Sequence, residues 1–202
     1  APAEERAFLL AHDTDPFNKW EAGSALAKEV MAEMVLKGTG PSRSWTDAVA
    51  AVVLDEGLDP AFRALCLQLP GEDDMAQTIH AMGRIPDPTK IHAARREMSG
   101  ALAIRLGEGL RTLYDGLDDG EPFSPSAEQA GRRALRLAAL ALLTRRDGGR
   151  LAARAYAEAR SMTEEIGALS ALLDVRQGQA ELDTFARRWG HDSNVMDKWF
   201  AL

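Results

Sequence analysis

The sequence is poor in the residues that build disulfides and metal centres. Its 202 residues include 1 cysteine and 4 histidines. Because Cys66 is alone, no disulfide can form within the chain, which fits a reducing compartment. The histidines are His12, His80, His92 and His191, and no two lie three to five residues apart, the spacing that places a pair of zinc ligands on one helix face. The residues therefore indicate no metal site and no bound cofactor in this chain.

Long apolar runs and a cationic surface are missing as well. No apolar run approaches the roughly 20 residues that span a bilayer, and the N-terminus lacks the basic and hydrophobic regions of a signal peptide. The formal net charge is -7 and 46% of the residues are hydrophobic. This composition is typical of a folded protein, and its negative charge disfavours binding to nucleic acid or anionic lipid. We expect neither nucleic acid nor a membrane among the partners.

Strand patterns are also missing, and helix signals dominate. Asp15-Pro16, Asp59-Pro60 and Asp87-Pro88 each pair an N-cap acceptor with a proline at the first helical position. The first of these pairs predicts a helix to about Lys37, which Gly38 ends. We expect its buried side to consist of Phe17, Trp20, Leu26, Val30, Met31 and Met34.

Further boundaries bring the expected total for the chain to about ten helices. Ser44 resembles the first residue of a capping box and predicts a helix to Gly57. A long helix from Asp87 to about Tyr114 contains Ser99-Gly100 and Gly107 as candidate kinks. Other helices are expected at 59–69, 72–83, 127–146 and 151–160, after Thr163, around 182–189 and from 192 onward. Short connectors predict antiparallel pairs, stacked into a curved, superhelical α-solenoid.

We expect one all-α domain over 1–202, with its best internal boundary in the Gly-, Asp- and Pro-rich loop 115–125. The last residues resemble the opening of an amphipathic helix whose apolar face consists of Val195, Met196, Trp199 and Phe200. No C-terminal stop signal follows this face. The pattern therefore predicts a solenoid truncated at its C-terminal end, with an uncovered apolar face that promotes self-association through residues 192–202.

One basic concentration is the strongest candidate for a binding role. It contains Arg132, Arg133, Arg136, Arg145, Arg146, Arg150 and Arg154. Guanidinium groups bind phosphates and carboxylates by paired hydrogen bonds. Charge runs on helices are more often solvated or paired with neighbouring helices, so the role of Arg132–Arg154 stays open. The acidic residues Asp115, Asp118, Asp119 and Glu121 lack the spacing of an EF-hand loop, which favours a solvated loop.

Several segments, in order along the chain, resemble one protein family. They include Asp13-Thr14-Asp15-Pro16-Phe17-Asn18-Lys19-Trp20-Glu21-Ala22, the blocks at 53–56, 59–61, 67–70, 87–88, 161–163 and 168–171, and Trp189-Gly190-His191-Asp192-Ser193-Asn194-Val195-Met196-Asp197-Lys198-Trp199-Phe200. Together they resemble the N-terminal part of the C-terminal helical domain of bacterial aminopeptidase N, in the M1 family of zinc metallopeptidases.

The resemblance implies a domain that arches over the zinc site of a larger cytoplasmic enzyme and limits which peptides enter. The zinc ion would belong to a catalytic domain absent from this chain, and the partners would be the remaining domains and the peptide substrate. Neither the His-Glu-x-x-His zinc motif nor the Gly-x-Met-Glu-Asn motif occurs here, so no catalytic, metal or substrate-binding residue is assigned.

Two alternatives remain open. A free-standing α-solenoid adaptor would bind peptide or protein on its concave face. A small helical enzyme with an unrecognised site is the third possibility, and the missing catalytic motifs disfavour it.

Overall fold

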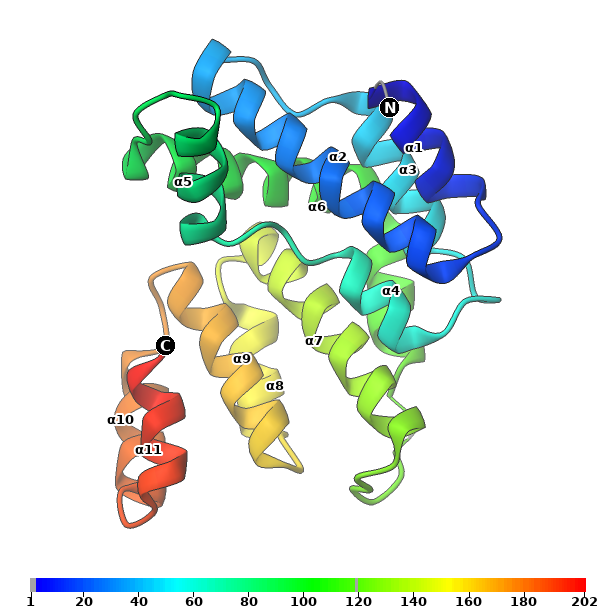
Figure 1. Cartoon of the computed structure of the whole chain (residues 1–202). Helices are drawn as coiled ribbons and strands as arrows, with labels where there is room; N and C mark the ends of the chain where they lie inside the picture. The colour runs from blue at the N-terminus through cyan, green and yellow to red at the C-terminus, as the bar shows by residue number, and fades with distance from the viewer. Residues whose placement is uncertain (1–2, 119) are drawn as a thin grey trace. The chain divides into compact units, whose positions relative to one another are not determined.

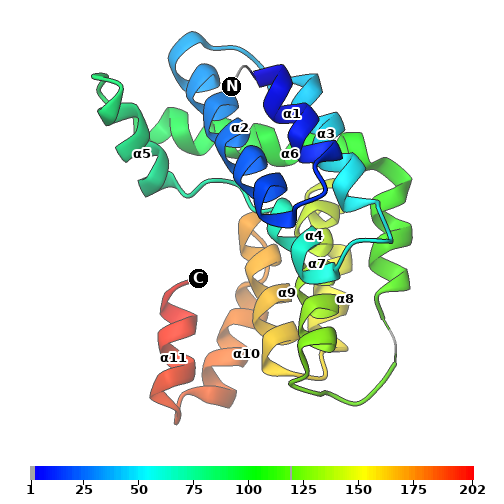
Figure 2. The same cartoon turned by 45° about the vertical axis from the view of Figure 1, so that its right-hand side comes forward.

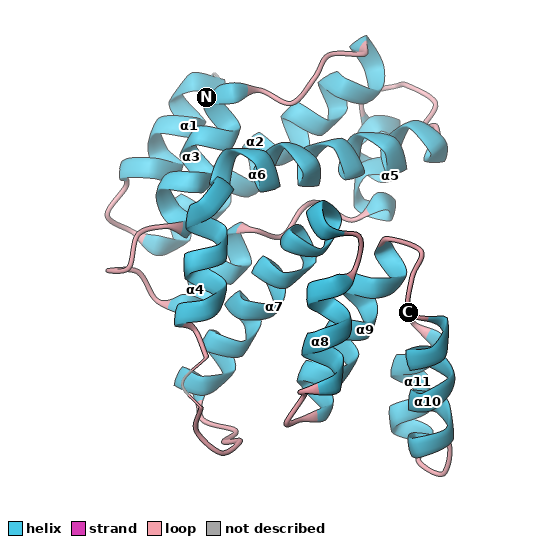
Figure 3. Cartoon of the chain, turned by 180° about the vertical axis from the view of Figure 1, so that it is seen from behind, coloured by secondary structure: helices cyan, strands magenta, loops and turns pink. Residues whose placement is uncertain are grey.

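The computed structural model describes residues 3–118 and 120–202. Within these residues the chain forms eleven helices and no strand (Figure 3), so the expected all-α class is confirmed. None of these helices is long and apolar enough to cross a membrane. The chain divides into two compact units, Ala1–Leu110 and Arg111–Leu202, and the division lies inside the sixth helix rather than in the loop at 115–125.

Helix α2 is the central element of the first unit. The unit contains α1 (Ala3–His12), α2 (Pro16–Lys37), α3 (Arg43–Val53), α4 (Pro60–Cys66), α5 (Glu72–Ala81) and most of α6 (Pro88–Gly116). Helix α2 contacts α1, α3, α4 and α5, and Figure 1 shows α1 packed along it. The largest buried side chains of the unit are Leu10, Leu26, Met31, Trp45, Met75, Ile79, Ile91, Met98, Leu102 and Leu110.

The three Asp-Pro pairs begin helices as predicted. The Asp15 carboxylate accepts hydrogen bonds from the Phe17 and Asn18 backbone N–H groups at 2.8 and 3.1 Å. Asp59 caps α4 and Asp87 caps α6 in the same way. Each carboxylate satisfies backbone donors that the first turn of a helix leaves unpaired. At the other end of α2, Gly38 adopts a left-handed conformation with φ of 70° and ends the helix as expected.

The expected inward face of α2 is wrong at its first turn. Phe17 is 64% exposed and Trp20 is 37% exposed. The buried stripe instead begins at Lys19 and Ala22, and the Lys19 ammonium donates a hydrogen bond to the Ala11 carbonyl of α1. Because successive residues are about 100° apart on a helix, this stripe turns Phe17 away from the core. The aromatic character of the first turn misled the sequence interpretation.

Two further boundaries of the first unit differ from the sequence expectation. Helix α1 was not predicted. Helix α3 begins two residues earlier than expected, because Ser42 rather than Ser44 accepts the hydrogen bond from the Trp45 backbone N–H. It ends at Val53, before Gly57. Capping by a serine two positions upstream satisfies the same kind of backbone donor, so the local pattern did not distinguish the two residues.

Helix α6 changes direction at one of the two predicted kinks. Gly107 has φ of 53° and ψ of −131°, outside the helical region, whereas Gly100 stays helical. Residues with a side chain rarely adopt a positive φ, so glycine is strongly favoured at position 107. The expected buried residues Ile91, Met98, Leu102, Leu106 and Leu110 are confirmed, and Leu113 is half-buried.

The second unit consists of helices that pack mainly on their neighbours in the chain. It contains the end of α6, then α7 (Ala127–Asp147), α8 (Arg150–Ala157), α9 (Met162–Asp174), α10 (Gln179–Trp189) and α11 (Ser193–Phe200). Helices α7, α8 and α9 contact one another, α9 contacts α10, and α10 forms a hairpin with α11 (Figure 2). Ser161 rather than Thr163 caps α9, because its hydroxyl accepts the Glu164 backbone N–H.

The expected uncovered face of the last helix is wrong for two of its four residues. Val195 is 5% exposed and belongs to a core cluster with Leu169 and Phe185. The Trp199 ring packs against this cluster and its indole N–H donates to the Leu182 carbonyl at 3.2 Å. Phe200 alone among the four is strongly exposed, at 75%. Helices α9 and α10 provide the cover, and self-association through residues 192–202 stays a prediction.

We predict that the Asp15 and Asp59 caps each stabilise the chain by about 1 kcal/mol. Asp15→Ala and Asp59→Ala should lower the free energy of unfolding by that amount, because backbone donors at the helix start lose their acceptor. Glu21→Ala is the control, since Glu21 is an exposed acid within α2 and its loss should change stability by less than about 0.5 kcal/mol. Denaturant titration measures all three, and equal stability of the cap variants and the control would contradict the assignment.

Gly100 and Gly107 of α6 provide a test with opposite signs. An added Cβ meets no atom within 4 Å at either Gly100 or Gly107, so only the backbone conformation distinguishes them. Gly100→Ala should raise the free energy of unfolding by about 0.4 to 1 kcal/mol, because alanine favours a helix. Gly107→Ala should lower it by about 1 to 3 kcal/mol, because of the positive φ. Thermal unfolding of both variants checks the kink, and a stabilising Gly107→Ala would contradict it.

Candidate functional site

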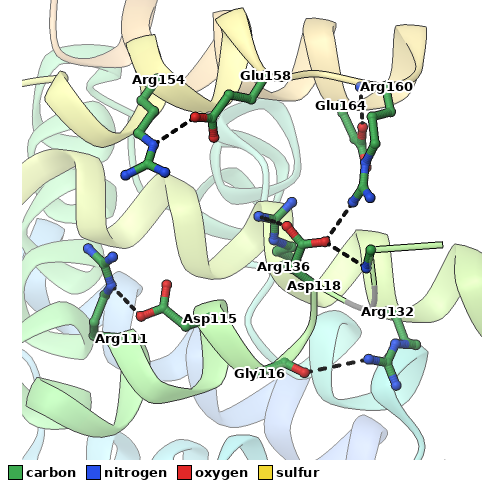
Figure 4. A network of polar contacts seen from close by, with 11 residues as sticks. Arg111, Asp115, Gly116, Asp118, Arg132, Arg136, Arg154, Glu158, Arg160 and Glu164 are labelled. Atoms are coloured by element: carbon green, nitrogen blue, oxygen red, sulfur yellow. Dashed lines mark hydrogen bonds and ion pairs between the residues drawn. The ribbon is translucent and has the colours of Figure 1, made fainter. Parts of the chain in front are cut away.

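The basic concentration that the sequence singled out lies in the second unit, where Arg132, Arg136 and Arg154 belong to a network of polar contacts (Figure 4). Two arginines pair with Asp118, and Arg136 of α7 is the more buried of them. Its guanidinium donates to the Asp118 carboxylate at 2.8 Å and lies 4.6 Å from the centroid of the Tyr114 ring. Stacking of a guanidinium on an aromatic face adds a cation–π attraction to the ion pair. Arg136 therefore links α7 to the end of α6.

Asp118 is the centre of the network. Besides Arg136, its carboxylate accepts hydrogen bonds from the Arg160 guanidinium at 2.7 Å and from the Gly120 backbone N–H at 3.1 Å. Partial burial acts to raise the pKa of Asp118, but the Gly120 N–H, Arg160 and Arg136 together bring this pKa below its ordinary value. The carboxylate is therefore charged at neutral pH, and the stability that it contributes is lost only as the pH falls through that lowered pKa.

The other arginines of the concentration are mostly paired within the same unit. Arg132 donates to the Gly116 carbonyl, and Arg133 donates to the Ser124 carbonyl and lies over the Phe123 ring. The remaining pairs are Arg145 with Asp174, Arg154 with Glu158 and, from α6, Arg111 with Asp115. These contacts favour the interpretation of the arginines as packing and ion-pairing groups.

A polar cavity of about 160 Å³ lies among three of these arginines. Arg111, Arg136 and Arg154 line it together with Asp115, Asp118 and Glu158. Each arginine faces its own carboxylate, so the lining carries no surplus positive charge that would attract a phosphate. The pairs of Arg111 and Arg154 are exposed i,i+4 pairs, which contribute little stability. The arrangement neutralises charge and contains no nucleophile with a base beside it.

Metal ligands do not gather in the part of the chain that the structure describes, where no group of three or more His, Cys, Asp or Glu residues fits a metal ion. His92 is exposed and its imidazole contacts Glu72 at 2.8 Å, while His80 is exposed on α5. Asp115 and Asp118, considered for calcium, pair with arginines instead, and Asp119 lies outside the described residues. Burial raises the pKa of the Cys66 thiol to about 11, so this thiol is neutral and unreactive near neutral pH.

Sequence reasoning missed one buried acid. Glu165 of α9 is 5% exposed, and its carboxylate accepts hydrogen bonds from the Arg188 guanidinium at 3.0 Å and the Trp189 indole at 3.2 Å. Burial and Glu165 raise the pKa of the neighbouring Tyr156 to about 12, so this phenol stays protonated. Its hydroxyl donates to the Glu181 carbonyl. These groups fasten α10 to α8 and α9 rather than forming a proton-transfer pair.

Known proteins match this chain over its full length. The aminopeptidase N of Caulobacter vibrioides is 35% identical over 100% of this chain, which corresponds to 24% of that protein. The aminopeptidase N of Escherichia coli is 30% identical over 98% of this chain and 23% of its own length. The chain therefore spans about a quarter of the length of these relatives.

A solved structure and a family model agree with these matches. Legionella pneumophila aminopeptidase A, solved in complex with aspartic acid, superposes with a TM-score of 0.83 over 99% of this chain and 25% of that protein. At 20% identity this match establishes the fold. The model of a domain of unknown function with ARM repeats, DUF3458_C, matches residues 3–202. This chain belongs to the DUF3458_C family of ARM-repeat domains and is the C-terminal helical region of an aminopeptidase N-like protein.

Proposed function

We propose that this chain is the helical domain that covers the active site of an aminopeptidase N-like zinc metallopeptidase and limits which peptides reach it. The observation that carries the proposal is the extent of the matches. Aminopeptidase N relatives align with this chain from end to end, while the chain corresponds to 24% and 23% of their lengths. A region of this kind contributes to a larger enzyme rather than acting as an enzyme alone.

The chemistry of the described residues supports a role without catalysis. The His, Cys, Asp and Glu side chains of this part of the chain make no set of ligands for zinc, so the metal would be held by residues of another domain. Of the arginines that stand out in the sequence, Arg136, Arg145 and Arg154 neutralise carboxylates of the same unit, and Arg132, Arg133 and Arg150 donate to backbone carbonyls of that unit. The chain would therefore act on a peptide only through the shape of its helical surface, which limits access. The proposal includes the cytoplasmic location that the resemblance implies.

A domain exchange in the Caulobacter vibrioides aminopeptidase N tests the proposal. In one variant this chain replaces the matched region, and in another a flexible linker replaces that region. Hydrolysis of alanyl-4-nitroanilide reports on the zinc site, and hydrolysis of peptides of increasing length reports on access. We expect the chimera to keep the discrimination between short and long peptides, and the linker variant to lose it while still cleaving the anilide, because nothing then restricts entry.

Two outcomes contradict the proposal. One is a linker variant that cleaves the anilide and still discriminates by length as the intact enzyme does. The other is a chimera that holds zinc and cleaves the anilide but has lost discrimination. Either result would favour the α-solenoid adaptor, whose peptide binding is independent of a neighbouring active site.

A further inference from the structure

The first unit contains a cavity of about 230 Å³ between α2, α3, α4 and the segment that leads to α5. Polar and apolar groups contribute about equally to its lining, and the apolar side chains are Leu10, Trp20, Ala27, Trp45, Val49, Leu65 and Leu69 among others. An engineered cavity of about 150 Å³ in another protein admits benzene, so this one has room for a substituted aromatic ring. Pockets for small ligands combine such walls with a few convergent polar groups.

The indole N–H groups of the four tryptophans differ in a way that singles out this cavity. Trp189 and Trp199, in the second unit, donate to the Glu165 carboxylate and the Leu182 carbonyl. Trp20 and Trp45 both line the cavity, and neither indole donates to any acceptor among residues 3–118 and 120–202. Trp45 is only 1% exposed. The indole N–H of a buried tryptophan normally has a hydrogen-bond partner. An acceptor bound within the cavity would provide that partner for Trp45.

Two further polar side chains of the lining are unengaged. The Ser24 hydroxyl and the Gln68 amide line the cavity, and neither makes a hydrogen bond within the described chain. Both groups donate and accept hydrogen bonds, whereas the two indoles only donate. The Asp74 carboxylate of the lining already pairs with Lys28, so an oxygen acceptor suits the unpaired groups better than another donor would.

The cavity presents no unbalanced charge. The Lys28 ammonium, on the lining, pairs with the Asp74 carboxylate at 2.8 Å. Burial raises the pKa of the Cys66 thiol to about 11, so this lining group is also neutral. Moving an ion into partly apolar surroundings is costly unless an opposite charge meets it. A neutral ligand is therefore favoured over an anion or a cation.

We propose that this cavity is a binding site for a small neutral molecule with an aromatic or branched apolar body and one oxygen acceptor. The apolar body lies against the rings of Trp20 and Trp45 and the side chain of Leu65. The oxygen accepts hydrogen bonds from the indole of Trp45 and from Ser24 or Gln68. Leu65, at 38% exposed, and Trp20, at 37%, lose water contact when the ligand enters. This site goes beyond the proposed function and does not depend on it.

Nuclear magnetic resonance of the 202-residue chain labelled with ¹⁵N tests the site. The probe is 4-fluoroacetophenone, which has an aromatic ring and a carbonyl acceptor. Its titration should shift the indole N–H signals of Trp20 and Trp45 to saturation and leave those of Trp189 and Trp199 in place. The comparison compound 1-ethyl-4-fluorobenzene has the same ring without an acceptor, and it should bind about two- to tenfold more weakly, because it forms no hydrogen bond.

Matched variants locate the binding. Ser24→Leu fills the cavity and should abolish the shifts, whereas Ala25→Leu places the same side chain at the next position, which lines a different groove, and should leave binding unchanged. Trp20→Phe keeps a ring but reduces the apolar surface that the ligand body covers, and should weaken binding about two- to tenfold. The proposal is overturned if the Trp20 and Trp45 signals stay in place, if all four indoles shift alike, or if Ser24→Leu binds as tightly as the unchanged chain.

Discussion

The structure depends on one constraint: the backbone N–H groups at the start of each helix need hydrogen-bond acceptors. A helix leaves four backbone N–H groups unpaired at its start, and a chain of short helices repeats this cost many times. The caps that meet it are Asp15, Ser42, Asp59, Asp87, Ser126, Ser161 and Asp192. Each cap fixes where a helix begins. Which face of that helix is buried is then decided by the helices that pack against it.

Local signals therefore predict much of the fold, and packing between helices decides the rest. Asp15-Pro16 and Gly38 define α2 correctly because a cap acts within one turn of the helix. The orientation of Phe17 and Trp20 was not predictable from this turn, since α1 and α3 determine which side of α2 is covered. The cover of Val195 and Trp199 likewise comes from Leu169, Phe185 and Leu182, which no local pattern identifies.

The arginine network divides in the same way between local and distant partners. Arg111 with Asp115 and Arg154 with Glu158 are four residues apart, and such pairs can be read from helical spacing. Arg160 meets Asp118 from 42 positions away, so only the fold reveals this contact. The same holds for Trp20 and Trp45, which the sequence assigns to the core and the structure places around one cavity. Contacts of this kind determine which polar groups are paired within the chain.

In the proposed function this chain supplies structure and a binding surface, and the chemistry belongs to another domain. The most direct test is to purify the 202-residue chain, dialyse it and measure both its zinc content and its release of 4-nitroaniline from alanyl-4-nitroanilide. Because the described residues provide no ligand set for zinc and no activated nucleophile, we predict zinc well below one ion per chain and no release above the buffer rate. One zinc ion per chain together with hydrolysis that a chelator abolishes would contradict this account.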